Sequence, residues 1–369
     1  MPSTTKTPLE PYIPPPETEA DLNYVSLEAL DLSLLSKPGG KEALAEHVLS
    51  SINKNGFFYV TNHGLTTVQI NTQYAIARAL FSLPLDEKLK YISNTAAGDF
   101  RGYKPQSTGA LGTRDNDERY NIPKFTPEHE RPHPELIREH WDEIREFRLH
   151  IHFQILLPLL RLFAFVLGID EDALVNIHRY EEPGLEYLRY MIYHPRSETE
   201  DIAAGNLWAK GHTDYNTLTF LFHQPVAGLQ VLSPSENGGK GEGEWRYVRS
   251  PPDAIIVNIA DALEYLSGGF LKSTVHRVVR PPRDQADKSR LSLIYFARPE
   301  ANVLMRPLDS PLLRRVGSKL DEGYFKALEG VTAEEWARAR IAKDHRFRTG
   351  VVDKHEREII AGVPQRYYD

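Results

Sequence analysis

At residues 217–222 the chain reads TLTFLF, a short apolar stretch of the kind that forms a buried β-strand. It is one of six such stretches, and turn residues such as Pro251-Pro252-Asp253 and Gly268-Gly269 separate them. Many short strands without intervening long helices favour an antiparallel barrel or jelly roll over repeated strand–helix–strand units. The six predicted strands are Leu188–Tyr193, Thr217–Phe222, Gly228–Leu232, Ala254–Ile259, Val275–Val279 and Leu291–Phe296.

Helices are predicted on both sides of this strand-rich part. Apolar residues at helical spacing predict helices over Lys41–Lys54, Val68–Leu83 and Glu135–Leu167, and Pro158 should kink or split the last of these. Thr332-Ala333-Glu334-Glu335 is a capping box that begins a further helix in the tail. We therefore expect an α+β fold in four regions: helices and first strands (1–125), a supporting long helix and connector (126–182), a jelly-roll core (183–310) and a helical C-terminal extension (311–369).

Composition narrows the classes of partner. The 369 residues carry a net charge of -7, so no basic field attracts nucleic acid or an anionic membrane. The chain has no cysteine, which excludes disulfides, thiolate metal ligands and cysteine nucleophiles. No unbroken apolar run reaches the roughly 20 residues of a membrane span. We expect a cytoplasmic monomer or homodimer with no nucleic-acid or membrane partner.

The sequence contains one candidate metal site. In His212-x-Asp214 the two side chains would share one face of a strand, with Cα atoms about 6.5–7 Å apart, so both can reach one metal. The pair alone is weak evidence, because this spacing is common by chance. His276 lies in a second β-branched strand that could cross the barrel. Two histidines and a carboxylate are the ligand set of a non-haem Fe(II) site.

Arg290-x-Ser292 applies the same alternation, because Arg290, Ser292, Ile294 and Phe296 share one face of the last strand. An arginine on an otherwise apolar, inward face is costly unless an anion pairs with it. A guanidinium with a neighbouring hydroxyl suits a carboxylate. The alternative is an arginine that faces solvent on an edge strand.

Several stretches resemble motifs of one enzyme family. In the first half these are Gly56–Gly64, which reads GFFYVTNHG, and Leu83–Lys88. In the second half Gly211–Tyr215, Leu218-Thr219, Gly228–Val231, Asn258–Asp261 and His276–Val278 follow in family order. Together they resemble the isopenicillin-N-synthase-like class of Fe(II)/2-oxoglutarate-dependent dioxygenases, over most of the chain.

This resemblance implies a distorted double-stranded β-helix, the cupin-like jelly-roll barrel, which holds Fe(II) through His212, Asp214 and His276. It implies that Arg290 and Ser292 bind the distal carboxylate of 2-oxoglutarate. Tyr193 falls where the family often has a tyrosine that contacts the same co-substrate, although Met191 stands nearby where an asparagine is usual. Dioxygen is the other co-substrate, and ascorbate the expected reductant. The implied reaction hydroxylates, desaturates or cyclises a small organic substrate of specialised metabolism and releases succinate and CO2.

Candidates for substrate contact come from the same two sources. Strand alternation brings residues of two strands to the face that carries Arg290, and the resemblance brings others to the barrel mouth. Each of them could equally have a structural role, and the helix around Trp336 either closes the mouth or packs outside it. The candidates are Arg189, Met191, Phe296 and Arg298 from the strands, and Tyr120, Ile122, Arg101 and Tyr103 near the mouth.

Three alternatives remain open at this point. An oxidase of the same fold could use iron and oxygen without 2-oxoglutarate, with Arg290 and Ser292 binding substrate or an activator. A non-catalytic binding protein could share the barrel, since fold does not fix function. A zinc hydrolase would use the same ligand types but would leave Arg290 and Ser292 unexplained. Succinate release coupled to turnover separates the first from a 2-oxoglutarate-dependent enzyme.

Overall fold

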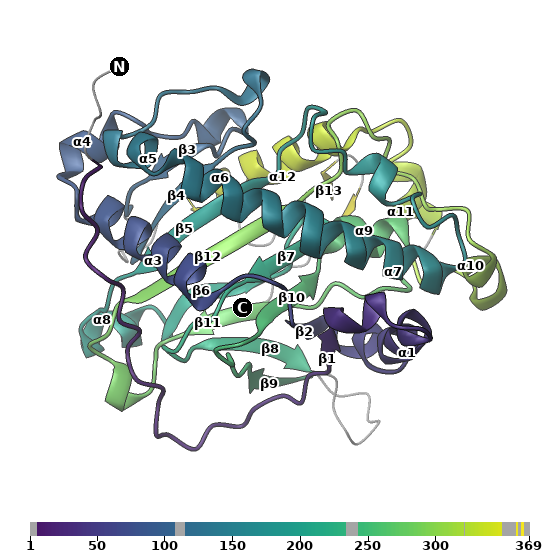
Figure 1. Ribbon diagram of the computed structural model, residues 1–369, viewed down its shortest axis with the longest axis horizontal. Coiled ribbons are helices and arrows are strands. Elements are labelled where there is room, and N and C mark those ends of the chain that lie inside the picture. The colour runs from purple at the N-terminus through teal and green to yellow at the C-terminus, as the bar shows by residue number, and fades with distance from the viewer. Residues whose placement is uncertain are drawn as a thin grey trace.

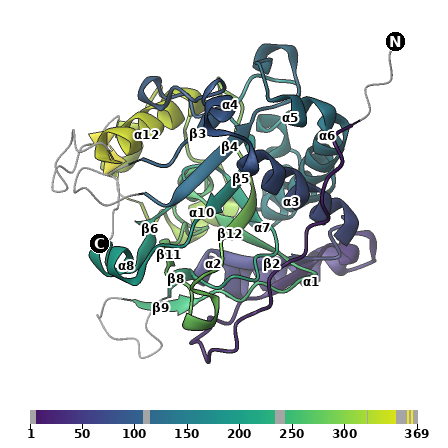
Figure 2. The ribbon, with the colours of Figure 1, turned by 90° about the vertical axis from the view of Figure 1, so that its left-hand side faces the viewer.

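Two antiparallel-rich sheets face each other in the computed structural model of the chain, which describes residues 6–107, 115–233, 243–320, 322–348, 359–360 and 363–364. The larger sheet has eight strands in the order β1-β2-β10-β7-β12-β5-β4-β3. The smaller has four, in the order β6-β11-β8-β9. Together they form the jelly roll that the sequence predicts, with helices packed outside it (Figures 1 and 2).

The strands are short, as expected for a jelly roll. Those of the larger sheet are β1 (Ala29–Asp31), β2 (Phe57–Thr61), β3 (Gly102–Lys104), β4 (Asp117–Ile122), β5 (Tyr187–Tyr193), β7 (Leu218–Leu221), β10 (Ile255–Ile259) and β12 (Arg290–Ala297). Those of the smaller sheet are β6 (Leu207–His212), β8 (Leu229–Ser233), β9 (Glu244–Tyr247) and β11 (His276–Val279), and β13 (Ile359–Ile360) pairs with β14 (Val363–Pro364).

The helices gather mainly on the outer face of the larger sheet, where α3, α6 and α7 lie across it (Figure 1). Apolar residues of that face, such as Leu188, Leu293 and Phe220, are fully buried beneath them in the main core. The helices are α1 (Gly40–His47), α2 (Asn53–Asn55), α3 (Thr67–Ser82), α4 (Leu85–Leu89), α5 (Glu135–Glu139), α6 (Trp141–His150), α7 (Leu157–Leu167), α8 (Glu198–Ala203), α9 (Asp261–Leu266), α10 (Pro311–Val316), α11 (Glu322–Ala327) and α12 (Ala333–Arg348).

The register between β5 and β12 decides which side chains face the barrel interior. Arg290 lies opposite Tyr193, and Ile294 lies opposite Arg189. Because side chains alternate along a strand, the intervening residues, such as Leu293, point to the helices instead. The inner face of the larger sheet therefore carries a row of polar and aromatic groups that begins at Arg290.

The six strands predicted from the sequence are confirmed as β5, β7, β8, β10, β11 and β12, with each boundary within one residue of the expected one. The predicted helix over Val68–Leu83 is confirmed as α3. The long predicted helix over Glu135–Leu167 is interrupted at His140, which separates α5 from α6, and a π-helical segment, Ile151–Leu156, precedes Pro158. Strands from the first region and from the core share the larger sheet, so the two are built together.

The continuous helix Trp141–Leu167 differs from expectation in one respect. By length and composition it could span a membrane, although no unbroken apolar run of that length exists in it. It carries polar residues such as Arg148 and His152, and both are fully buried against the sheet. The apolar stretch is 56% buried inside the protein, as the core helix of a soluble protein would be. This segment is therefore weak evidence for a membrane span.

The C-terminal region covers one end of the barrel. The predicted capping box at the start of α12 is confirmed: Thr332 Oγ1 accepts from the Glu335 N–H at 3.2 Å, and Glu335 accepts from the Thr332 N–H at 2.9 Å. Trp336 is buried in a cluster with Tyr265 of α9, and Ile341 is buried with aromatic residues of the large sheet. Helix α12 thus packs across the barrel end rather than beside it (Figure 2).

Candidate metal centre

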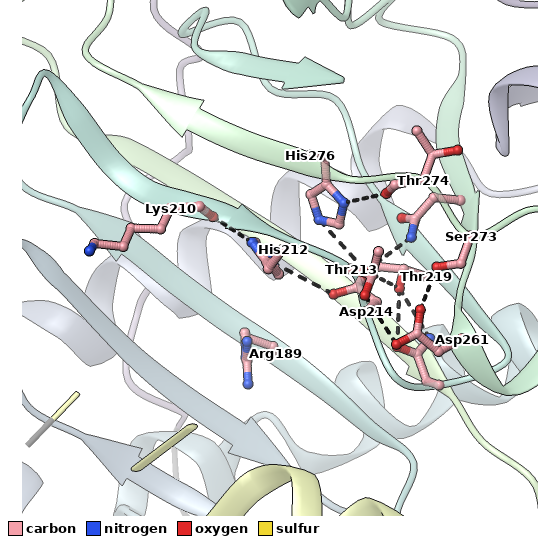
Figure 3. Close-up of polar contacts among 12 residues, drawn as sticks. Arg189, Lys210, His212, Thr213, Asp214, Thr219, Asp261, Ser273, Thr274 and His276 are labelled. Carbon is pink, nitrogen blue, oxygen red and sulfur yellow. Dashed lines mark hydrogen bonds and ion pairs between the residues drawn. The ribbon is translucent and has the colours of Figure 1, made fainter. Parts of the chain in front are cut away.

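Three side chains of the kinds that bind metals converge where the smaller sheet meets the loop after β6. His212 ends β6, His276 begins β11, and the register of the two strands sets these residues directly opposite each other. Asp214 Oδ1 lies 4.0 Å from His212 Nε2, and Asp214 Oδ2 lies 3.9 Å from His276 Nε2 (Figure 3). All three donor atoms lie within 4.8 Å of one another. This spacing and this donor set fit a single non-haem iron.

The local geometry corrects one prediction. Asp214 does not share a strand face with His212, because β6 ends at His212 and Asp214 lies in the following loop. The cross-strand pairing of His212 with His276 brings the group together, and the loop then returns the carboxylate to them.

Both imidazoles are oriented by the backbone. His212 Nδ1 lies 2.8 Å from the Lys210 carbonyl, and His276 Nδ1 lies 3.2 Å from the Thr274 carbonyl. A carbonyl can only accept, so Nδ1 carries the proton in each ring and Nε2 keeps its lone pair for a metal. The same arrangement at both histidines fixes the tautomer that metal binding needs.

Two neutral donors hold the carboxylate. Thr219 Oγ1 and Asn258 Nδ2 donate to Asp214 Oδ2 at 2.6 and 3.0 Å. Burial alone would raise the pKa of Asp214, but His276, His212 and these hydrogen bonds lower it below its ordinary value. The group is therefore a carboxylate at neutral pH. The His212 side chain is 41% exposed against 10% for His276, so the centre opens on the His212 side.

Asp261, at the start of α9, connects the metal residues to the rest of the barrel. Its carboxylate accepts from Thr213 Oγ1 at 3.0 Å, from Ser273 Oγ at 2.7 Å and from Arg340 Nη2 at 2.8 Å. Its own N–H donates to the Asp214 carbonyl at 2.9 Å. The family motif around Asp261 does not predict this role, because the hydrogen-bond partners of Asp261 lie far away in the chain.

A candidate anion site lies on the inner face of the larger sheet. Arg290 is only 4% exposed, and it donates to the Val226 carbonyl at 3.2 Å and to Ser292 Oγ at 3.1 Å. No carboxylate among the described residues pairs with it, and burial lowers its pKa. A buried guanidinium with donors to spare suits a carboxylate ligand. Tyr193, opposite Arg290, stacks on Trp208 of β6, so this site lies between the two sheets.

The sequence matches two families. Residues 27–143 match the family described as non-haem dioxygenase in morphine synthesis N-terminal, and residues 174–299 match the 2OG-Fe(II) oxygenase superfamily. The chain is also 32% identical over 318 residues to the UPF0676 protein C1494.01 of Schizosaccharomyces pombe, covering 81% of this chain and 87% of that protein. The chain belongs to the Fe(II)/2-oxoglutarate-dependent oxygenase family.

This oxygenase is also similar to a plant dioxygenase and to a fungal protein of known structure. Leucoanthocyanidin dioxygenase 1 of Oryza sativa subsp. indica is 29% identical over 341 residues, which cover 86% of this chain and 84% of that enzyme. The crystal structure of full-length Neurospora crassa T7H in complex with α-ketoglutarate (2-oxoglutarate) and 5-formyluracil matches with a TM-score of 0.71 and 25% identity, covering 88% of this chain and 100% of that one. The jelly-roll core is common to such neighbours.

Four of the candidate substrate residues of the oxygenase lie on or directly continue the inner face of the larger sheet. Met191 and Arg189 follow Tyr193 along β5, and Phe296 and Arg298 follow Arg290 along β12. Met191 packs with Tyr193 and Trp208 between the sheets. The alternation of side chains along β5 and β12 therefore predicts correctly that these four residues lie on the same side of the sheet.

Tyr120 and Ile122 do not join them. The register of β4 with β5 sets Tyr120 opposite Tyr190, on the face that the helices cover, and Ile122 belongs to the same fully buried core. Tyr120 hydrogen-bonds His133 there at 2.7 Å. The expectation was wrong by one residue of register, because Asn121, opposite Arg189, faces the interior instead.

Arg101 and Tyr103 also lie elsewhere, and Tyr103 is in strand β3 rather than in a loop. Tyr103 lies opposite Tyr120 and donates to Glu118 on the helix-covered side. Arg101 forms an ion pair with Asp99 at 2.8 Å. The neighbouring residue, Phe100, is the one that packs against the inner face, with its ring tilted against that of Tyr187.

Proposed function

We propose that this oxygenase binds Fe(II) through His212, Asp214 and His276, binds 2-oxoglutarate through Arg290 and Ser292 beside Tyr193, and oxidises a small organic substrate of specialised metabolism. One observation carries the proposal. Two histidines oriented by backbone carbonyls and an ionised carboxylate converge at the end of the smaller sheet, and Arg290, buried on the larger sheet, has no carboxylate partner among the described residues.

In this scheme the protein residues position the ligands and balance their charges. Iron held by these residues would supply the oxidising chemistry with dioxygen and 2-oxoglutarate, and the co-substrate would be converted to succinate and CO2. Arg290 neutralises the distal carboxylate of the co-substrate, and Ser292 adds a hydroxyl donor. Thr219 and Asn258 keep Asp214 fixed and ionised. No side-chain acid, base or nucleophile is required.

The assignment to small-molecule chemistry is supported by the relatives. Leucoanthocyanidin dioxygenase is named for a mid-sized organic substrate, and T7H has been crystallised with 5-formyluracil. Hydroxylation, desaturation and cyclisation are all consistent with the same centre.

The decisive experiment uses the purified chain under anaerobic conditions. Fe(II) with 2-oxoglutarate should produce a weak visible charge-transfer band, and His212→Ala and Asp214→Ala should abolish both the band and succinate release. His47→Ala is the matched control, since His47 is 48% exposed and pairs with Glu28 on the surface. Retention of band and activity in either metal-site variant would contradict the proposal. Oxygen consumption without succinate release would favour the 2-oxoglutarate-independent oxidase. Failure to bind iron would favour the non-catalytic protein.

A further inference from the structure

Four aromatic rings gather on the inner face beyond the metal residues. Phe100, Tyr187 and Phe296 form a buried cluster with Tyr215 packed against it; we call these four rings the aromatic cluster. The Tyr187 ring lies 4.3 Å from that of Phe100 and 4.7 Å from that of Phe296, centroid to centroid. Tyr215 directly follows the metal-site residue Asp214, so the aromatic cluster begins beside the proposed iron.

Arg189 projects among these rings with no ion-pair partner among the described residues. Its guanidinium lies 5.1 Å from the centroid of Tyr187 and 4.8 Å from that of Phe296. Its Nε donates to Asn121 Oδ1 at 2.8 Å and its Nη2 to the Tyr187 hydroxyl at 3.1 Å, both neutral acceptors. Burial lowers its pKa, and no carboxylate of the described residues forms an ion pair with it. Figure 3 shows Arg189 below His212, the most exposed of the three metal-site residues.

A second arginine, Arg298, lies over two of the same rings and has no ion-pair partner in the described part of the chain. Arg298 is 4% exposed, and within the described chain its Nε and Nη1 have no hydrogen-bond partner. Its guanidinium lies 4.5 Å from the Tyr215 centroid and 5.5 Å from the Tyr187 centroid. Arg189 and Arg298 therefore share the Tyr187 ring, and the aromatic cluster holds two positive charges.

Neighbouring arginines show the contrast. Arg119, also on the inner face, pairs with Asp117, and Arg340 of α12 pairs with Asp261 at 2.8 Å. Glu334 lines the same small cavity as Arg298 but pairs with Arg338 at 2.6 Å. Arg298 is buried and Arg189 is partly buried, and because removing an unpaired charge from water is costly, two such charges at one place indicate that an anion completes them.

Arg189 is also distinct from the co-substrate site. It lies opposite Ile294, four residues along β12 from Arg290, which corresponds to a strand length of about 13 Å. With Nε and one Nη2 hydrogen engaged, the end of the guanidinium formed by Nη1 and the other Nη2 hydrogen remains. That end can hold a carboxylate through two parallel hydrogen bonds.

We propose that the substrate of this oxygenase is a carboxylic acid with an apolar body, whose carboxylate binds Arg189 while Arg298 adds a second positive charge. The aromatic cluster, together with Ile294 and Met191 toward the co-substrate, supplies the apolar surroundings of the body. This inference rests on the proposed function, because it concerns the substrate of the same site.

The test compares acids with their methyl esters, which keep the body and remove the charge. Phenylacetate, trans-cinnamate, cyclohexylacetate and indole-3-acetate, each with its ester, are assayed for stimulation of succinate release by the iron-loaded full chain. At least one acid should exceed its ester in kcat/KM by about tenfold or more. Arg189→Met should remove that preference mainly by raising KM for the acid, and Arg189→Lys should restore part of it.

Two controls keep the outcomes distinct. The anaerobic 2-oxoglutarate band reports folding and co-substrate binding in each variant, and Arg161→Met, which alters an arginine 43% exposed on α7, should leave the acid preference intact. Absence of the band in the unmodified chain would mean that the proposed function itself fails. If the band is present but acids stimulate no better than esters, including the case in which neither stimulates, the carboxylate assignment is wrong. It is equally wrong if Arg189→Met keeps the preference.

Discussion

Arg340→Met should weaken both the fold and the metal centre, although Arg340 belongs to the C-terminal helix. Its Nη2 donates to Asp261 Oδ2 at 2.8 Å, and the two side chains are only 4% and 9% exposed. Asp261 in turn accepts from Thr213, between two of the metal-site residues, and from Ser273, just before the third. The arginine therefore neutralises the carboxylate that ties the ligand segments together.

The expected magnitude follows from burial. Removing one partner of a buried ion pair costs about 3–5 kcal/mol, because the remaining charge stays desolvated. Asp261 keeps its two hydroxyl donors, so we expect the lower end, about 3 kcal/mol in the free energy of unfolding. Residues that orient metal ligands typically change metal affinity by about 10–100-fold, and we expect Fe(II) affinity to fall within this range.

Urea unfolding and anaerobic Fe(II) titration measure the two effects. Arg338→Met, in the same helix, is the matched control: Arg338 and Glu334 form an i,i+4 pair with side chains 37% and 35% exposed, so its loss should cost well under about 1 kcal/mol. In an Asp261→Asn background, Arg340→Met should cost less, because no buried charge is then left unpaired.

The reasoning would be refuted by an Arg340→Met protein as stable as Arg338→Met. A protein that loses stability but binds Fe(II) with unchanged affinity would show that α12 supports the fold without acting on the metal centre.

Three further outcomes are expected. Thr219→Val removes a hydrogen bond to Asp214 and should weaken Fe(II) binding by about tenfold in the same titration. Arg290→Met should raise KM for 2-oxoglutarate by about 10–100-fold in succinate release, yet increase the urea stability of the ligand-free protein, because an unpaired buried charge disappears. Burial lowers the pKa of His178 to about 4, below the 6.5 of an unfolded histidine, so the unfolded state binds more protons and stability falls as pH drops from 6.5 toward 4. The resulting loss in the free energy of unfolding is about 1.4 kcal/mol between pH 7.5 and 5.5, and His178→Gln should abolish this pH dependence.

Short-range sequence patterns were sufficient to predict much of the fold. The alternation of apolar residues located β12 and assigned Arg290, Ser292 and Phe296 to one face, because a strand's side chains alternate whatever lies beside it. The capping box at Thr332 likewise depends only on residues within one helical turn.

Long-range register could not be read in the same way. Tyr120 was expected at the barrel mouth, but its face depends on how β4 pairs with β5, and a shift of one residue reverses every side chain. Asp214 was expected on a strand that ends two residues earlier. The contact of Asp261 with Arg340 joins residues 79 apart in sequence, and no local pattern encodes it.

Arg290 and Arg298, buried on the inner side of the larger sheet, lack among the described residues the ion pair that Arg148 forms on the helix-covered side, and this difference separates structural from functional charge. On the helix-covered side Arg148 is 0% exposed but pairs with Glu186 at 3.2 Å, so its charge is balanced within the protein. On the interior side Arg290 and Arg298 are each 4% exposed, and neither has a described carboxylate partner. A protein that folded only for stability would gain by replacing them with apolar residues, since an unpaired buried charge opposes folding. Arg290 lies on the inner face of β12 and Arg298 directly follows that strand, so we infer that their counter-ions are ligands. In the proposed scheme 2-oxoglutarate balances the charge of Arg290, and an acidic substrate balances the charges at the aromatic cluster.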